Sequence, residues 1–97
     1  MREIDVGEII KAVEELCIKA NKILPDDLCG CISCAEKSET DELPKKIMGT
    51  LLENLDAAKE LNLPICQDTG MAVIFCDVGQ DVHIVGGDFE NAVNEGV

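Results

Sequence analysis

The sequence contains very few aromatic and basic residues. Its 97 residues include no Trp, no Tyr and two Phe, and 8 Lys and Arg stand against 20 Asp and Glu, for a net charge of −12. Nucleic-acid binding needs a basic surface and aromatic stacking platforms, so both shortages exclude it.

The longest apolar run covers residues 71–76, whereas a membrane helix needs about 20 residues. The charged start, Met1–Asp5, is not typical of a signal peptide, and we expect a soluble, cytoplasmic protein that binds neither nucleic acid nor membranes.

The basic residues are also unevenly placed. Residues 60–97 contain seven acidic side chains and no Lys or Arg. An anionic substrate bound near residue 66 would therefore take its positive charge from a metal, from backbone amides or from protein outside the chain. A chain this short buries only about 60 to 65% of its unfolded surface, so we expect catalysis to require more protein than these residues provide.

Six cysteines are present, at positions 17, 29, 31, 34, 66 and 76. Without an export signal, reduced thiols are favoured over a disulfide framework. Cys29, Cys31 and Cys34 have a C-x-C-x-x-C spacing that suits zinc or an iron-sulfur cluster. The same stretch also has helical spacing, and the single histidine, His83, leaves a zinc ligand set incomplete. A metal-binding or assembly module and an ordinary helix both stay open.

The apolar spacing predicts an α+β protein with three N-terminal helices followed by a strand pair. Helical periods cover residues 6–24, 26–35 and 43–61, with Asp5 and Glu8 as a capping pair and with Asn62 and Pro64 as the final stop. Residues 71–78 and 82–85 are predicted to be strands joined by a turn at 79–81. Asp88 is expected to cap another helical pattern, which is unfinished at residue 97. We expect a helical region (1–63), a loop with the strand pair (64–87) and the start of a truncated helix (88–97).

Two cysteines fall inside apolar patterns, and Cys66 does not. Cys17 and Cys76 are expected in the core. Cys66 follows a long helix and precedes the polar residues 67–70, a position that favours a metal ligand or a nucleophile. Asp68 by itself is equally typical of a side-chain turn with Gly70.

A longer motif surrounds Cys66. Residues 64–73 read PICQDTGMAV, and GQDVHI at 79–84 and Gly86-Gly87 follow. Together they closely resemble the N-terminal part of the alpha subunit of iron-sulfur hydro-lyases, the family of class I fumarate hydratases and L-tartrate dehydratases. The opening Met1–Val6, expected as helix, and the break at Leu24-Pro25 are similar too. Family alpha subunits are much longer, so the resemblance implies an N-terminal fragment of a larger catalytic domain.

The resemblance implies a specific site. Cys66 matches the first of three cysteines that hold a 4Fe-4S cluster, and the other two would lie beyond Val97. Gln67 and Asp68 match residues that contact the bound dicarboxylate. The catalytic base is not identified. Cys29, Cys31 and Cys34 depart from the family pattern and are not assigned to the cluster.

The resemblance also implies partners and limits. The complete protein is expected to be an oligomer that pairs with a beta subunit or a C-terminal domain and acts on fumarate, malate or tartrate. The fragment alone is expected to be inactive and to lack the cluster, because one thiolate of three anchors it weakly.

Overall fold

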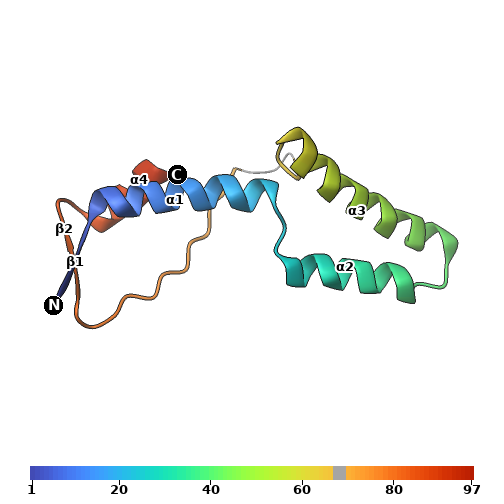
Figure 1. Cartoon of the computed structure of the whole chain (residues 1–97), viewed down its shortest axis with the longest axis horizontal. Coiled ribbons are helices and arrows are strands. Elements are labelled where there is room, and N and C mark those ends of the chain that lie inside the picture. Colours follow the sequence, from blue (N-terminus) through green and yellow to red (C-terminus); the bar gives the residue numbers. More distant parts are fainter. Residues whose placement is uncertain (67–69) are drawn as a thin grey trace. The chain divides into compact units, whose positions relative to one another are not determined.

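The computed structural model describes residues 1–66 and 70–97 and has two compact units (Figure 1). Unit 1 comprises Met1–Lys19 with Thr69–Val97, and unit 2 comprises Ala20–Asp68. The structure is rich in helix and contains a small parallel sheet of two strands, which agrees with the predicted α+β class.

The sheet of unit 1 joins distant parts of the sequence. Strand β1 (Arg2–Asp5) pairs in parallel with β2 (Val82–Val85), and Ile4 lies opposite Ile84. Side chains alternate between the two faces of a strand, which leaves Ile4 and Ile84 half-buried while His83 is exposed. Ile4 and Ile84 thus lie side by side on one face of the sheet.

The predicted partner of β2 was wrong. Residues 71–78 do not form a strand, and the opening residues 2–5, expected to be helical, form β1 instead. The turn before β2 is present, with the Val82 amide donating to the Gly79 carbonyl at 3.1 Å. A high β-propensity produces a strand only when the backbone finds a hydrogen-bonding partner, and β2 pairs with β1. The 71–78 run is consequently exposed throughout, with Phe75 at 93%.

Helices α1 (Val6–Lys22) and α4 (Phe89–Gly96) begin at the aspartates expected to cap them. The Asp5 carboxylate accepts from the Gly7 amide at 2.8 Å, and the Asp88 carboxylate accepts from the Asn91 amide at 3.0 Å. Such bonds satisfy first-turn amides that have no partner within the helix. Among the described residues of unit 1, Val13 of α1 and Ala92 of α4 are the buried hydrophobic ones.

Unit 2 contains a helical hairpin. Helices α2 (Asp26–Ser38) and α3 (Glu42–Leu61) pack against each other in opposite directions (Figure 1). Helix α2 runs three residues beyond its predicted end at Ala35, and Lys37 in its last turn complements the negative end of the helix dipole. Leu55 and Ala58 of α3 are its buried residues. Within the described residues, no helix combines the length and apolar character needed to cross a membrane.

Candidate functional site

The route into the Cys66 loop is fixed by the end of α3. Asn62 adopts the left-handed conformation (φ 56°, ψ 47°). The Leu63 amide donates to the Ala58 carbonyl at 3.0 Å, and the Asn62 amide donates to the Lys59 carbonyl at 3.4 Å. This pair of bonds is the Schellman motif, which Asn accepts because it tolerates positive φ. The predicted stop at Asn62 is confirmed, and it sets the direction in which the chain leaves the helix.

Ile65, the residue before Cys66, is held from two sides. Its amide donates to the Asn21 carbonyl at 2.7 Å, and its carbonyl accepts from the Asn54 side-chain amide at 2.9 Å. Asn21 belongs to the last turn of α1, where carbonyls lack helical partners, and Asn54 belongs to α3. Both polar groups of Ile65 are therefore satisfied by other elements. We call this arrangement, formed by Asn21, Asn54 and Ile65, the Ile65 anchor.

Cys66 lies in an exposed bend directly after the Ile65 anchor and is not part of a disulfide. An exposed thiol is a soft ligand for iron or zinc once deprotonated. Gln67 and Asp68, the residues expected to contact substrate, lie outside the described residues. In the described ranges 1–66 and 70–97, no three His, Cys, Asp or Glu side chains are grouped so that they could hold a metal ion. The exposed Cys66 thiol fits the role of one ligand in a donor set of several thiolates.

The fold brings a basic side chain to the end of α3, four residues before Cys66 in the sequence. Lys22 Nζ, near the end of α1, donates to Asn62 Oδ1 at 3.2 Å. The charge pattern along the sequence, with no base after Lys59, did not reveal it, because the two residues are 40 positions apart. Asn54 was missed for a similar reason, since an isolated Asn on a helix is typical of a solvated face and carries no signal of its own.

The cysteine triplet has no common site in α2. Successive helical residues are rotated by about 100°, so Cys29 lies about 200° from Cys31 around the helix. Cys29 is half-buried, and its thiol donates to the Leu24 carbonyl at 3.6 Å, whereas Cys31 and Cys34 are exposed. The described structure thus gives no support to a three-thiolate metal module.

The remaining cysteines differ from expectation to different degrees. Cys17 in α1 is half-buried rather than fully buried. Cys76, expected in the core, is exposed, because the run that carries it is not part of the sheet.

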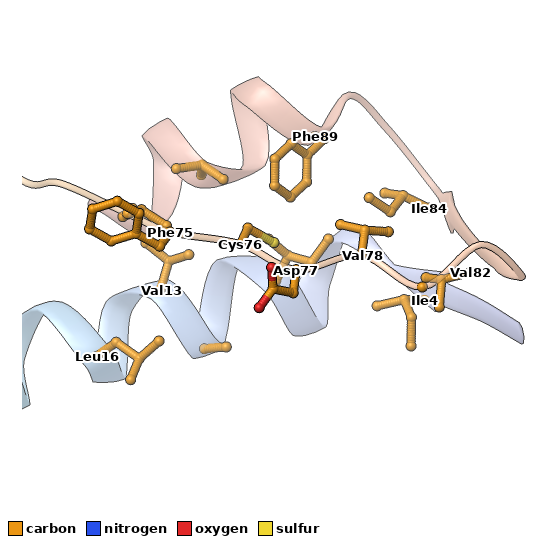
Figure 2. A pocket seen from close by; sticks show the side chains of 15 residues that line it. Ile4, Val13, Leu16, Phe75, Cys76, Asp77, Val78, Val82, Ile84 and Phe89 are labelled. Atoms are coloured by element: carbon orange, nitrogen blue, oxygen red, sulfur yellow. The ribbon is translucent and has the colours of Figure 1, made fainter.

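Unit 1 contains an apolar groove of about 310 Å³ (Figure 2). The groove is lined by residues of several segments, among them Val13 and Leu16 of α1, Phe89 of α4, and Cys76 and Val78 of the 71–78 run. Asp77 is its one charged lining residue among those described. A dicarboxylate would be repelled by this carboxylate and would lose its hydration without compensation, so the groove does not suit an anionic substrate.

Comparisons with known proteins agree with the motif around Cys66. A provisionally named L(+)-tartrate dehydratase subunit alpha of Methanocaldococcus jannaschii is 33% identical over 76 residues, which is 78% of this chain and 27% of that protein. The L(+)-tartrate dehydratase subunit alpha of Escherichia coli K12 is 30% identical over 81 residues, which is 84% of this chain and 27% of the relative. The match thus spans about a quarter of the length of these relatives. The search of solved structures gave no significant match.

A family model described as fumarate hydratase (Fumerase) matches residues 10–97. The match includes most of α1, the hairpin of unit 2, Cys66 and everything that follows. The resemblance inferred from the PICQDTG motif is therefore confirmed, and the chain belongs to the fumarate hydratase (Fumerase) family.

Proposed function

We propose that the chain is the N-terminal part of the alpha component of an iron-sulfur hydro-lyase, which adds water to or removes it from a small dicarboxylate. The substrates would be fumarate and malate, or tartrate. The partner would be a beta subunit or a C-terminal domain, in a cytoplasmic oligomer. The relatives carry the name of tartrate dehydratase subunit alpha, and the matching family model is described as fumarate hydratase. Both names denote lyases that act on a four-carbon diacid.

Cys66 would be one of three thiolate ligands of a 4Fe-4S cluster. Its exposure and its place after a hydrogen-bonded anchor fit a ligand that must face a cofactor rather than the core. The other two ligands would come from protein beyond this chain. When bound, a cluster with one iron open to substrate supplies a Lewis acid that polarises the substrate hydroxyl and carboxylate.

The neighbouring residues would orient the substrate. The Gln67 side-chain amide would donate a hydrogen bond to a substrate carboxylate, and the Asp68 carboxylate would accept one from the substrate hydroxyl. An ionised Asp68 beside a dianion is unfavourable unless positive charge lies nearby. Lys22 donates a hydrogen bond to Asn62, which lies four residues before Cys66 in the sequence, and the Lys22 ammonium group would supply part of that charge. The base that removes the proton next to a carboxylate would lie outside this chain, so this chain alone would be inactive.

The observation that carries the proposal is the exposed Cys66 thiol after the Ile65 anchor, in a chain whose residues 10–97 match the family model. The direct test is Cys66→Ser in the complete alpha chain with its beta partner, reconstituted anaerobically with ferrous iron and sulfide. We expect iron and acid-labile sulfide bound per chain to fall to background, because serine is a poor ligand for soft iron-sulfur centres.

Cys31→Ser is the matched control, because Cys31 is also an exposed thiol, on α2. It should retain the iron and sulfide of the parent. If Cys66→Ser kept its cluster, the proposal would be wrong. Loss of bound metal on changing Cys31 alone would instead favour a module built on Cys29, Cys31 and Cys34.

A further inference from the structure

We propose that Asn54 is a positioning residue for Cys66: its side chain holds the peptide group that joins Ile65 to Cys66 and thereby sets where the Cys66 sulfur is presented. The inference rests on the proposed role of Cys66 as a cluster ligand.

The hydrogen bond from Asn54 acts on the peptide group that joins Ile65 to Cys66. The carbonyl of Ile65 and the amide of Cys66 belong to one planar unit that also includes both α-carbons. Asn54 Nδ2 donates to that carbonyl at 2.9 Å. Its hydrogen bond therefore acts on the plane from which the Cys66 side chain departs, although Asn54 is 11 residues from Ile65 in the sequence.

The preceding peptide unit is held as well. The Ile65 amide shares a plane with the Pro64 carbonyl, and it donates to the Asn21 carbonyl at 2.7 Å. With both planes around Ile65 held, the φ and χ1 rotations of Cys66 are the main freedoms left to its sulfur. A metal ligand benefits from this restriction, because groups that orient a first ligand affect metal affinity about 10- to 100-fold.

The exposure of Asn54 argues against a purely structural role. The buried residues of α3 are Leu55 and Ala58, whereas Asn54 is exposed. Replacing an exposed helix residue by alanine normally changes stability little. The Asn54 side chain contributes instead to the loop, because its donor reaches the carbonyl immediately before Cys66. Removing that donor should therefore alter the loop and leave the core of the hairpin intact.

The experiment uses Asn54→Ala and Asn54→Asp in the complete alpha chain with its beta partner. The second variant keeps the shape of the side chain but removes its donor. Asp56→Ala, at an exposed position of the same helix, is the control. The first measurement is amide hydrogen exchange in the protein before reconstitution. Exchange of the Ile65 amide should become about fivefold faster in both Asn54 variants, as expected for losing one supporting hydrogen bond, while the Leu55 and Ala58 amides should keep their rates.

The second measurement is the rate at which a chelator removes iron from the reconstituted complex, together with the paramagnetic resonance spectrum of its reduced cluster. We expect iron release to be about tenfold faster in the Asn54 variants, with an altered spectrum, while Asp56→Ala matches the parent.

The outcomes separate this inference from the proposed function. If Cys66→Ser loses the cluster but Asn54→Ala releases iron and exchanges Ile65 at parental rates, the positioning role is refuted and the ligand role stands. If the Leu55 and Ala58 amides speed up together with Ile65, Asn54 is structural and the inference is wrong. A cluster retained in Cys66→Ser overturns both ideas, and does so through a different variant.

Discussion

Two glycines in helices should respond in opposite ways to the same added methyl group. Gly96 is buried at the end of α4, and a Cβ placed there would lie 2.7 Å from Val13 Cβ and 2.8 Å from the Ile10 carbonyl oxygen. Both contacts are shorter than van der Waals separation, and the carbonyl belongs to the backbone of α1, so it cannot turn aside. Gly30 in α2 has no atom within 4 Å of the corresponding position.

The expected magnitudes follow from these surroundings. Overpacking of this kind costs about 1 to 3 kcal/mol, and the better helix propensity of alanine returns at most about 1 kcal/mol. Because Gly96 is the last residue of α4, little of that propensity gain applies there, and Gly96→Ala should destabilise the contact between α4 and α1 by about 1 to 3 kcal/mol. Gly30→Ala keeps the propensity gain without the clash and should stabilise α2 by about 0.8 to 1 kcal/mol.

Amide hydrogen exchange reports the local stability of unit 1 and of unit 2 separately. It is therefore preferable to a global unfolding curve, which assumes a single two-state transition for the whole chain. In Gly96→Ala the Val13 amide should exchange about 5 to 150 times faster. In Gly30→Ala the amides of α2 should exchange about fourfold more slowly. An unchanged or slower Val13 amide in Gly96→Ala would show that α4 does not approach α1 as closely as described, and the reasoning would fail.

Two further substitutions test the ends of helices. Asp88→Ala removes the side-chain acceptor of the Asn91 amide and should cost about 1 kcal/mol, seen as faster exchange within α4; an unchanged rate would mean that the cap contributes nothing. Alanine adopts the left-handed conformation less readily than asparagine, and residue 62 has φ 56°. Asn62→Ala should therefore destabilise the end of α3 by about 1 kcal/mol, measured as faster exchange of the Leu63 amide. Asn62→Gly, which accepts this conformation freely, should keep that rate near the parental value.

Local signals in the sequence located most of the helical boundaries. The aspartates at positions 5 and 88 were expected to cap helices, and both accept the hydrogen bonds of a cap. Asn62 was expected to end α3 and adopts the left-handed conformation of such a stop. These features depend on residues within one helical turn of each other, and short-range chemistry is readable from the sequence.

The strands were predicted less well. The residues of β2 were identified correctly, but the partner was assigned to the neighbouring apolar run instead of to residues 2–5. The short REID segment has almost no apolar pattern of its own. Its pairing with β2 joins positions about 80 residues apart in the sequence, and no local preference reports a contact of that length.

The sequence alone indicated the family of this protein through the PICQDTG motif, and the match to the family model confirms it. The strong acidity and the few aromatic residues predict that it does not bind nucleic acid. Only the tertiary structure decided what surrounds the motif. The Asn21 carbonyl, the Asn54 amide and the Lys22 ammonium group reach residues 62–65 from two different helices. The residues of a motif follow one another along the chain, so the sequence shows them directly. The groups that orient the motif come from distant segments that only folding brings together, and their positions in the sequence follow no regular spacing.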